Sequence, residues 1–317
     1  MFKLDFNIPE SSNKINLKQP ILLIGSCFSD DIGHKLSSCK FDSLSNPFGT
    51  IYNPFSIFKL LSNGAASDNI IENQGVHYHW DAHGVISCLD QQKTINLFNE
   101  KKNHTQTFLA KAKWLIVTLG TSMVYELTNG EIVANCHKVA SSHFKKRFLS
   151  QEEIIKQFSL LHSYLSELNS ELNIIFTVSP VRHIRDGLID NNRSKAILID
   201  AIHTISEEYE NTCYFPSFEI VLDELRDYRY YATDRIHPSS EAIDYVWERF
   251  RASYFDSETE TILKDWDKLR TAINHKPFHL ASASHQKFLK NTLEKLEQMN
   301  EKIDVSVEIE QLRNQLQ

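Results

Sequence analysis

The sequence contains few cysteines and no cysteine motif. Five cysteines are scattered over 317 residues, and no pair has the CxxC spacing of a zinc ribbon or a thioredoxin-like redox site. A chain this long with so few cysteines also lacks the framework of a disulfide-rich secreted domain. We therefore expect free thiols and a reducing compartment. The cysteines are Cys27, Cys39, Cys88, Cys136 and Cys213.

An excess of positive charge is also missing. The chain has 34 Lys and Arg residues against 41 Asp and Glu residues, which gives a formal net charge of -7. Binding to nucleic-acid phosphates needs a concentrated basic surface, so nucleic acid is not expected as the main partner.

Long apolar runs are absent as well. The first 20 residues lack the apolar core of a secretory signal peptide. No stretch approaches the roughly 20 apolar residues that a membrane-spanning helix needs. These features predict a cytoplasmic protein with no membrane partner.

Four short apolar runs are present, and each ends at a glycine or proline signal. Most of them do not alternate with polar residues, which is typical of parallel strands buried on both faces. Helical patterns lie between them, including a capping box at Ser150 and Glu153. This alternation predicts an α/β fold with a doubly wound parallel sheet. The runs are Ile21–Ile24, Trp114–Leu119, Ile174–Val178 and Cys213–Phe215.

Two regions depart from this alternation. Residues 62–112 are polar and aromatic, with HYHWDAHG at 77–84, and predict an inserted hairpin or lid. The last stretch is charged with leucines at helical spacing, which predicts a C-terminal helical extension. We expect a main domain over 1–255 and an extension over 256–317.

The leucines of this extension allow two arrangements. Their 4-3-7 spacing fits a short coiled-coil seam, which would support a weak homodimer. The seam is barely two heptads long, so a helix packed on its own domain is the favoured interpretation. The seam residues are Leu289, Leu293, Leu296 and Ile303.

A strand, a tight turn and a helix start follow one another in ILLIGSCFSDDIGHKL. Chemistry in open parallel sheets collects beyond the carboxyl ends of the strands. A hydroxyl or thiol there also lies at a helix N-terminus, which favours a thiolate or a developing oxyanion. Ser26 and Cys27 are thus both candidate nucleophiles, although a plain turn with a buried cysteine explains the same residues.

A D-x-x-H motif lies near the other end of the main domain. Asp234 and His237 stand three residues apart, just before a predicted helix that Ser239 or Ser240 can cap. An aspartate at this spacing can fold back on the imidazole, fix its tautomer and stabilise the imidazolium. A solvated loop with a helix cap would give the same pattern.

The order of these two motifs resembles that of the SGNH/GDSL esterase superfamily. GSCF, together with the later NPFG, GTSMVY, CHK, SPVRH and D-x-x-H-P-S, resembles the GSCFA-domain family within it, although Ser29 replaces the final alanine. The resemblance covers roughly residues 15–255. It implies a three-layer α/β/α sandwich around the parallel sheet.

The resemblance also implies roles for individual residues. Asp234 and His237 match the last block of the superfamily, and Gly49 matches the glycine whose N–H helps to form the oxyanion hole. Ser122, with Thr121 beside it, stands where the superfamily usually has an asparagine. A hydroxyl reaches less far than an amide, so this departure weakens the implied oxyanion hole.

Two registers of the nucleophile block remain open. Aligning the glycines places Cys27 at the position of the nucleophile, with Phe28 as an apolar anchor, and this register is slightly favoured. Aligning the serines makes Ser26 the nucleophile. A histidine partner and a helix N-terminus would depress the pKa of a Cys27 thiol below about 8.5.

Further groups are candidates for substrate binding. Arg182 and His183 follow a predicted strand directly, and His137 and Lys138 lie in a segment that could reach the same edge. A structural ion pair is an equal alternative for Arg182.

The histidines at 77, 79 and 83 have a spacing that a metal could use. No cysteine or acidic cluster completes a site, so no metal is expected there.

These features predict an acyl-ester hydrolase or acyltransferase that uses Cys27 or Ser26 with Asp234 and His237. By resemblance, the substrate is an O-acylated carbohydrate or a small-molecule ester, and hydrolysis needs no cofactor. The alternative is a carbohydrate-binding module without catalysis on the same fold.

Overall fold

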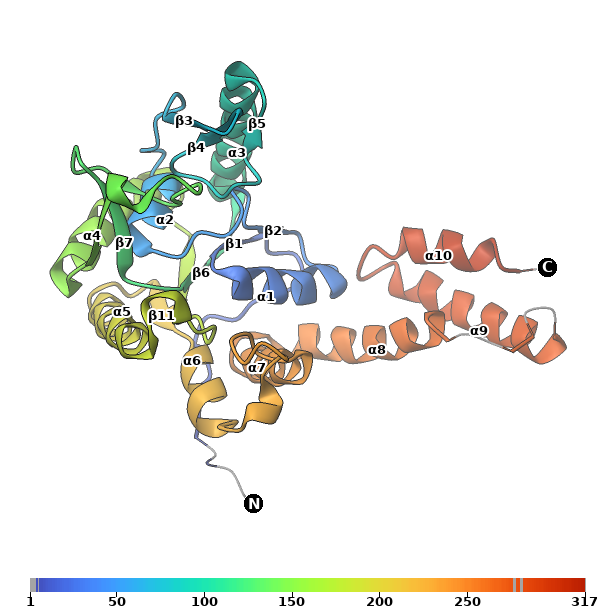
Figure 1. The fold of residues 1–317 in the computed structure, drawn as a ribbon. Helices are drawn as coiled ribbons and strands as arrows, with labels where there is room; N and C mark the ends of the chain where they lie inside the picture. Colours follow the sequence, from blue (N-terminus) through green and yellow to red (C-terminus); the bar gives the residue numbers. More distant parts are fainter. Residues whose placement is uncertain (1–3, 5, 276–277, 280–281, 317) are drawn as a thin grey trace.

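A five-stranded parallel sheet forms the centre of the protein (Figure 1). The computed structural model describes residue 4 and residues 6–275, 278–279 and 282–316. The order of the strands across the sheet is β11-β10-β6-β1-β2. Their bounds are β1 Ile21–Gly25, β2 Ser43–Ser45, β6 Trp114–Leu119, β10 Asn173–Val178 and β11 Thr212–Tyr214.

Helices cover both faces of this sheet. On β1, Ile21 and Leu23 pack with α1 and α7, whereas Leu22 and Ile24 pack on the opposite face with α2, α3, α4 and α5. Alternate side chains of a strand point to opposite faces, so a run of apolar residues serves both layers. The helices are α1 Cys27–Ser38, α2 Pro54–Leu61, α3 Gln91–Lys111, α4 Gln151–Leu168, α5 Leu188–Glu208 and α7 Ser240–Tyr254.

Local sequence signals fix where several helices begin. The capping box at Ser150 and Glu153 is present at the start of α4, and Ser239 caps α7 by accepting from the Ala242 N–H. The predicted α/β fold with a parallel sheet and layered helices is therefore confirmed, including its four predicted strands. The short strand β2 was not predicted, because its three residues carry no apolar run.

The region at 62–112 combines a hairpin with a long helix. β3 (Ile70–Asn73), β4 (Val76–His79) and β5 (Ser87–Cys88) form an antiparallel sheet. The rest is α3, whose Phe98, Phe108 and Leu109 pack in the core on the face of the main sheet that carries Leu22 and Ile24. Only the first part is thus an inserted hairpin, because α3 belongs to the helical layer.

A second antiparallel sheet was not foreseen. It has the order β8-β7-β9, with bounds β7 Met123–Leu127, β8 Ile132–Val133 and β9 Phe144–Phe148. The FKKRF sequence of β9 is mostly charged at its centre, so it gives no strand signal of its own.

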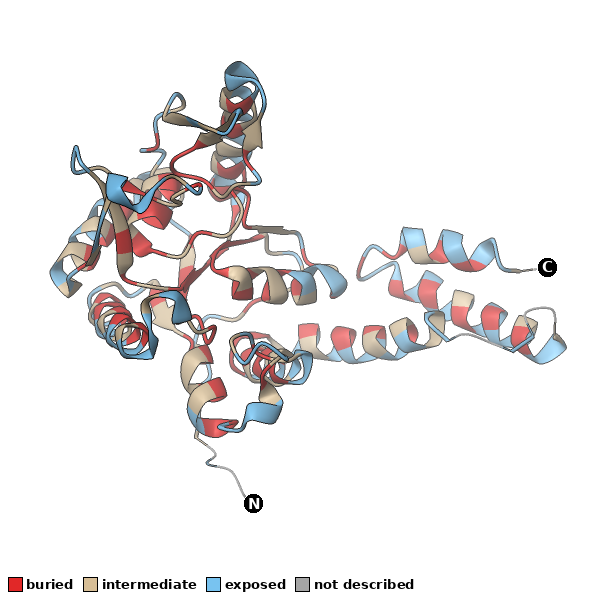
Figure 2. Cartoon of the chain, in the orientation of Figure 1, coloured by how far each residue is buried: buried red, intermediate tan, exposed pale blue. Residues whose placement is uncertain are grey.

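The C-terminal helices extend away from the sheet as an arm (Figure 1). They are α8 (Ser257–Ile273), α9 (Ala283–Met299) and α10 (Ser306–Arg313). Each of these helices carries buried residues (red in Figure 2), and Leu289, Leu296 and Ile303 of the predicted seam pack within this chain. The indole of Trp266 donates to the Ser38 carbonyl at 2.8 Å, which joins the arm to α1. A homodimer through this helix stays a prediction.

The helices of the described residues include none with the length and apolar character required to cross a bilayer.

The turn after β1 depends on Gly25. Its φ is +143°, and a Cβ at this position would lie 2.1 Å from the Thr118 carbonyl oxygen of the neighbouring strand. Only glycine has both the conformational freedom and the small size that this approach needs.

Gly25→Ala should therefore lower the free energy of unfolding by at least about 3 kcal/mol, because backbone strain and overlap add. Gly75→Ala is the matched control, since Gly75 has a φ of +78° and nothing within 4 Å of the added Cβ. Strain alone should cost this control about 1–2 kcal/mol. Urea denaturation measures both variants, and equal losses would contradict the close-approach argument.

Candidate active site

Ser26 and Cys27 have different environments at the end of β1. Ser26 caps α1, is only 1% exposed, and its Oγ accepts a hydrogen bond from the Phe28 N–H at 3.3 Å. Cys27 is the first residue of the helix and is half-buried. The serine hydroxyl is thus occupied in the turn, whereas the thiol is the more accessible of the two groups.

The side chain of Asn46 holds this turn in place. Its Oδ1 accepts from the Gly25 N–H at 2.8 Å, and its Nδ2 donates to the Ser26 carbonyl at 3.3 Å and the Asp30 carboxylate at 2.8 Å. Asn46 itself has a φ of +40°, which asparagine tolerates better than most residues. One amide therefore connects the loop after β2 to the strand end and the first turn of α1.

Asp234 and His237 form the pair that the sequence predicts. Asp234 Oδ2 lies 2.7 Å from His237 Nδ1, and its Oδ1 accepts from the backbone N–H groups of Ile236 and His237. The His237 hydrogen bond, followed by these two N–H groups, lowers the pKa of the Asp234 carboxyl to about 2. The pair orients the imidazole so that Nε2 is left for proton transfer.

Cys27 and His237 both interact electrostatically with one carboxylate at this edge of the sheet. The charge of Asp31, in α1, interacts with both residues. Burial raises the pKa of the Cys27 thiol, and Asp31 and Asp30 raise it further. The expected depression of this pKa is therefore wrong, because burial and two carboxylates outweigh the backbone N–H groups at the helix start.

The groups that the resemblance implied for an oxyanion hole already have partners. The Gly49 N–H donates to the Asn46 carbonyl at 2.8 Å. Thr121 Oγ1 and Ser122 Oγ lie 2.9 and 3.2 Å from Ser194 Oγ, and Ser122 is fully buried. The hydroxyl of Ser194, on α5, is thus a hydrogen-bond partner of the two hydroxyls that follow β6. No sequence motif predicts this contact.

Arg182 and His183 lie next to the pair, as predicted from their place after β10. Arg182 donates to the Arg235 carbonyl at 2.9 Å, and its guanidinium carbon lies 4.0 Å from the ring centroid of Tyr231. The guanidinium also lines a cavity of about 630 Å³, together with Tyr228, Tyr231 and other residues. Burial, followed by the nearby Lys195, lowers the pKa of His183 to about 4.

His137 and Lys138 instead belong to the hairpin side of the molecule. The His137 ring stacks on Tyr78 at 4.7 Å, and its Nε2 lies 2.9 Å from the His79 carbonyl. Lys138 is exposed. His79 has both ring nitrogens engaged, with the Ala66 carbonyl and the Asp81 N–H. His79 and His137 therefore contribute to the packing of the hairpin.

Lys195 is a site residue that sequence reasoning missed. It is 2% exposed, and its ammonium donates to the carbonyls of Gly120 and Ser179, both at 2.7 Å. These carbonyls follow β6 and β10 directly. A lysine in a helical sequence is expected at the surface, so the sequence gives no sign that Lys195 is buried.

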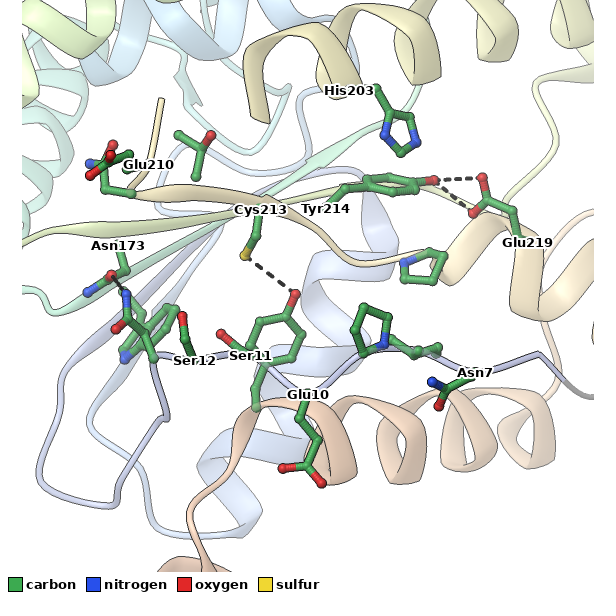
Figure 3. A pocket seen from close by; sticks show the side chains of 18 of the residues that line it. Asn7, Glu10, Ser11, Ser12, Asn173, His203, Glu210, Cys213, Tyr214 and Glu219 are labelled. Atoms are coloured by element: carbon green, nitrogen blue, oxygen red, sulfur yellow. Dashed lines mark hydrogen bonds between the residues drawn. The ribbon is translucent and has the colours of Figure 1, made fainter. Parts of the chain in front are cut away.

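A second cavity, of about 560 Å³, lies at the opposite end of the strands (Figure 3). Trp114 and Asn173, which begin β6 and β10, line it together with β11 and the N-terminal segment. The Tyr214 hydroxyl contacts both carboxylate oxygens of Glu219 there, at 2.9 and 2.8 Å. This cavity is thus separate from the edge where Cys27 lies.

The Asp234 carboxyl should titrate with a pKa of about 2 in carboxyl ¹³C NMR, because the pair stabilises its charged form. The interaction is present above the ordinary pKa of 3.8 and is lost as the pH falls through 2. His237→Ala should return the pKa of Asp234 toward 3.8. Asp227, which is paired with Arg229, is the internal control. An unchanged Asp234 titration in the variant would contradict the pairing.

Two family models match the sequence of this chain. A sequence model of the GSCFA family matches residues 20–250, and one of the GSCFA domain protein, C-terminal domain, matches residues 266–317. No functionally curated protein is significantly similar in sequence.

Two solved structures are similar at low identity. A carbohydrate esterase family 3 protein from Talaromyces cellulolyticus has a TM-score of 0.35 and 7% identity, over 78% of this chain and 99% of its own. An acetyl xylan esterase from Butyrivibrio proteoclasticus has a TM-score of 0.34 and 11% identity, over 84% of this chain and 66% of its own. The family match covers most of the chain and confirms that its motifs are those of the GSCFA family. The protein belongs to the GSCFA family.

Proposed function

We propose that this protein is an SGNH-type esterase or acyltransferase with Cys27 as its nucleophile. The observation that carries the proposal is the Asp234–His237 hydrogen bond, at the sheet edge where Cys27 begins α1. A histidine oriented by a carboxylate, near a thiol at a helix N-terminus, is the arrangement that acyl transfer needs. Ser26 is the less suitable nucleophile, because its hydroxyl is buried and caps the helix.

The raised pKa of Cys27 favours proton transfer during the reaction over a preformed thiolate. His237 Nε2 takes the thiol proton as the sulfur attacks the ester carbonyl carbon. The alcohol then leaves with that proton, and a thioester remains on Cys27. Water, or an acceptor hydroxyl in a transferase, attacks the thioester through His237, which restores the thiol. This sequence needs no cofactor, although a transferase needs an acyl donor.

The oxyanion of the tetrahedral intermediate requires donors that are not already engaged. Gly49, Thr121 and Ser122 have internal partners, so they would have to exchange these to contribute. The Cys27 N–H is the better candidate, since Cys27 is the first residue of α1. Donors at a helix N-terminus stabilise negative charge as it develops.

The cavity beside Arg182 supports an O-acylated carbohydrate as the substrate. Tyr228 and Tyr231 provide aromatic surface, and Asn192, Asp223 and Arg182 provide groups that bond hydroxyls. Aromatic faces combined with such polar groups suit sugar rings. The loop that holds Arg182 also contacts the His237 loop, so a sugar bound there would present its ester near the nucleophile.

A second candidate function, carbohydrate binding without catalysis, is favoured by the engaged hydroxyls of Thr121 and Ser122. An acylating p-nitrophenyl ester probe separates the two functions. An enzyme should be labelled at Cys27, and labelling should be lost in His237→Ala. A binding module should show sugar affinity and no labelling.

Cys27→Ala should reduce kcat/KM for p-nitrophenyl acetate by at least about 10³-fold, as expected for loss of a nucleophile. Ser26→Ala should keep activity within about tenfold and lose about 1 kcal/mol of stability, because it removes a helix cap. Steady-state kinetics and urea denaturation measure the two effects. An inactive Ser26→Ala with an active Cys27→Ala would reverse the assignment of the nucleophile.

A further inference from the structure

Lys195 is a buried lysine at the proposed site, and no carboxylate among the described residues forms an ion pair with it. Lys195 Nζ donates to the Gly120 and Ser179 carbonyls at 2.7 Å, and these residues directly follow the neighbouring strands β6 and β10. β1, which leads to Cys27, is the next strand beside β6. Burying a lysine costs free energy unless its charge is used or compensated.

The position of this lysine couples it to the nucleophile. Burial lowers the pKa of Lys195 to about 7, and a charge on Cys27 raises it. Such coupling is reciprocal, so a charge on Lys195 must favour the Cys27 thiolate by the same free energy. The Phe218 ring lies 5.9 Å from Nζ and adds no charge.

Several other groups near Cys27 oppose the formation of its thiolate. Asp30 and Asp31 oppose a negative charge on the sulfur, as does burial, and Tyr52 offers no positive charge. Burial keeps His183 uncharged near neutral pH. His237, the helix N-terminus and Lys195 are groups that favour the thiolate, whereas His34, His83 and Lys35 interact with the carboxylates Asp30 and Asp31.

We propose that the Lys195 ammonium, fixed by the carbonyls of Gly120 and Ser179, stabilises the negative charge that forms on the Cys27 sulfur. Lys195 thus acts through Cys27, and it also lines the cavity beside Arg182. It also ties together the two strand ends beside the nucleophile, so that its charge stays at a fixed place. This inference rests on the proposed role of Cys27.

The test measures alkylation of Cys27 by iodoacetamide between pH 6 and pH 9, with mass spectrometry of the Cys27 peptide. Lys195→Met removes the charge and keeps the apolar volume. Alkylation should be about tenfold slower than in the native protein at pH 6, where Lys195 holds its proton. The difference between the two rates should shrink to less than about twofold at pH 9, because Lys195 of the native protein is then neutral and, like the methionine, carries no charge.

Two further variants separate charge from structure. Lys195→Gln keeps N–H donors for the carbonyls without a charge, and it should be as slow as Lys195→Met at pH 6. Lys102→Met is the control, since Lys102 also donates to a backbone carbonyl, that of Ala65, at 2.7 Å but lies on α3. It should leave the profile unchanged. Circular dichroism verifies that each variant is folded.

Several results would overturn the inference. These are a Lys195→Met profile that matches the native one, an equal change at every pH, faster alkylation, or full recovery in Lys195→Gln. The experiment uses no ester substrate, so it stands apart from the enzymatic assay. An active Cys27→Ala enzyme would instead remove the proposed function, whatever the alkylation profile shows.

Discussion

The hydrogen bonds of the Asn46 side chain are the constraint on which the proposed site depends. One amide joins the Gly25 N–H, the Ser26 carbonyl and the Asp30 carboxylate, so three consecutive parts of the β1–α1 turn share a single anchor. Gly25 can then approach Thr118 closely, and α1 begins at Cys27 with its N-terminus facing the strand ends. The serine before Cys27 is fixed as the helix cap, which places Cys27 at the first position of α1.

The sequence predicts the central architecture because that architecture depends on local patterns. Four of the five parallel strands are short apolar runs buried on both faces, and helix caps at Ser150 and Ser239 lie where capping residues indicate. The remaining elements lack such patterns. β2 and β9 are short or charged and exist because neighbouring strands pair with them, and α3 has too few apolar residues for a clear helical period. Tertiary contacts determine these elements.

The site is predictable to a smaller extent for the same reason. Asp234 and His237 are close in sequence, so their spacing alone predicts their hydrogen bond. Lys195 and Ser194 are distant in sequence from the strands they contact, and a lysine on a helix carries no signal of burial. The sign of the Cys27 pKa shift likewise depends on burial, a property of the fold. A helix N-terminus and a histidine predict a lowered value, and burial with two carboxylates reverses it.

The central claim is that an acyl group passes through the sulfur of Cys27. Its most direct test is to mix the protein with p-nitrophenyl acetate, quench the mixture in acid within the first turnovers, and map acetylated peptides by mass spectrometry. The account predicts one acetyl group, on Cys27, that disappears on longer incubation and fails to form in His237→Ala. Acetylation of Ser26 instead, or an intact protein without any acetyl group while the ester is hydrolysed, would contradict it.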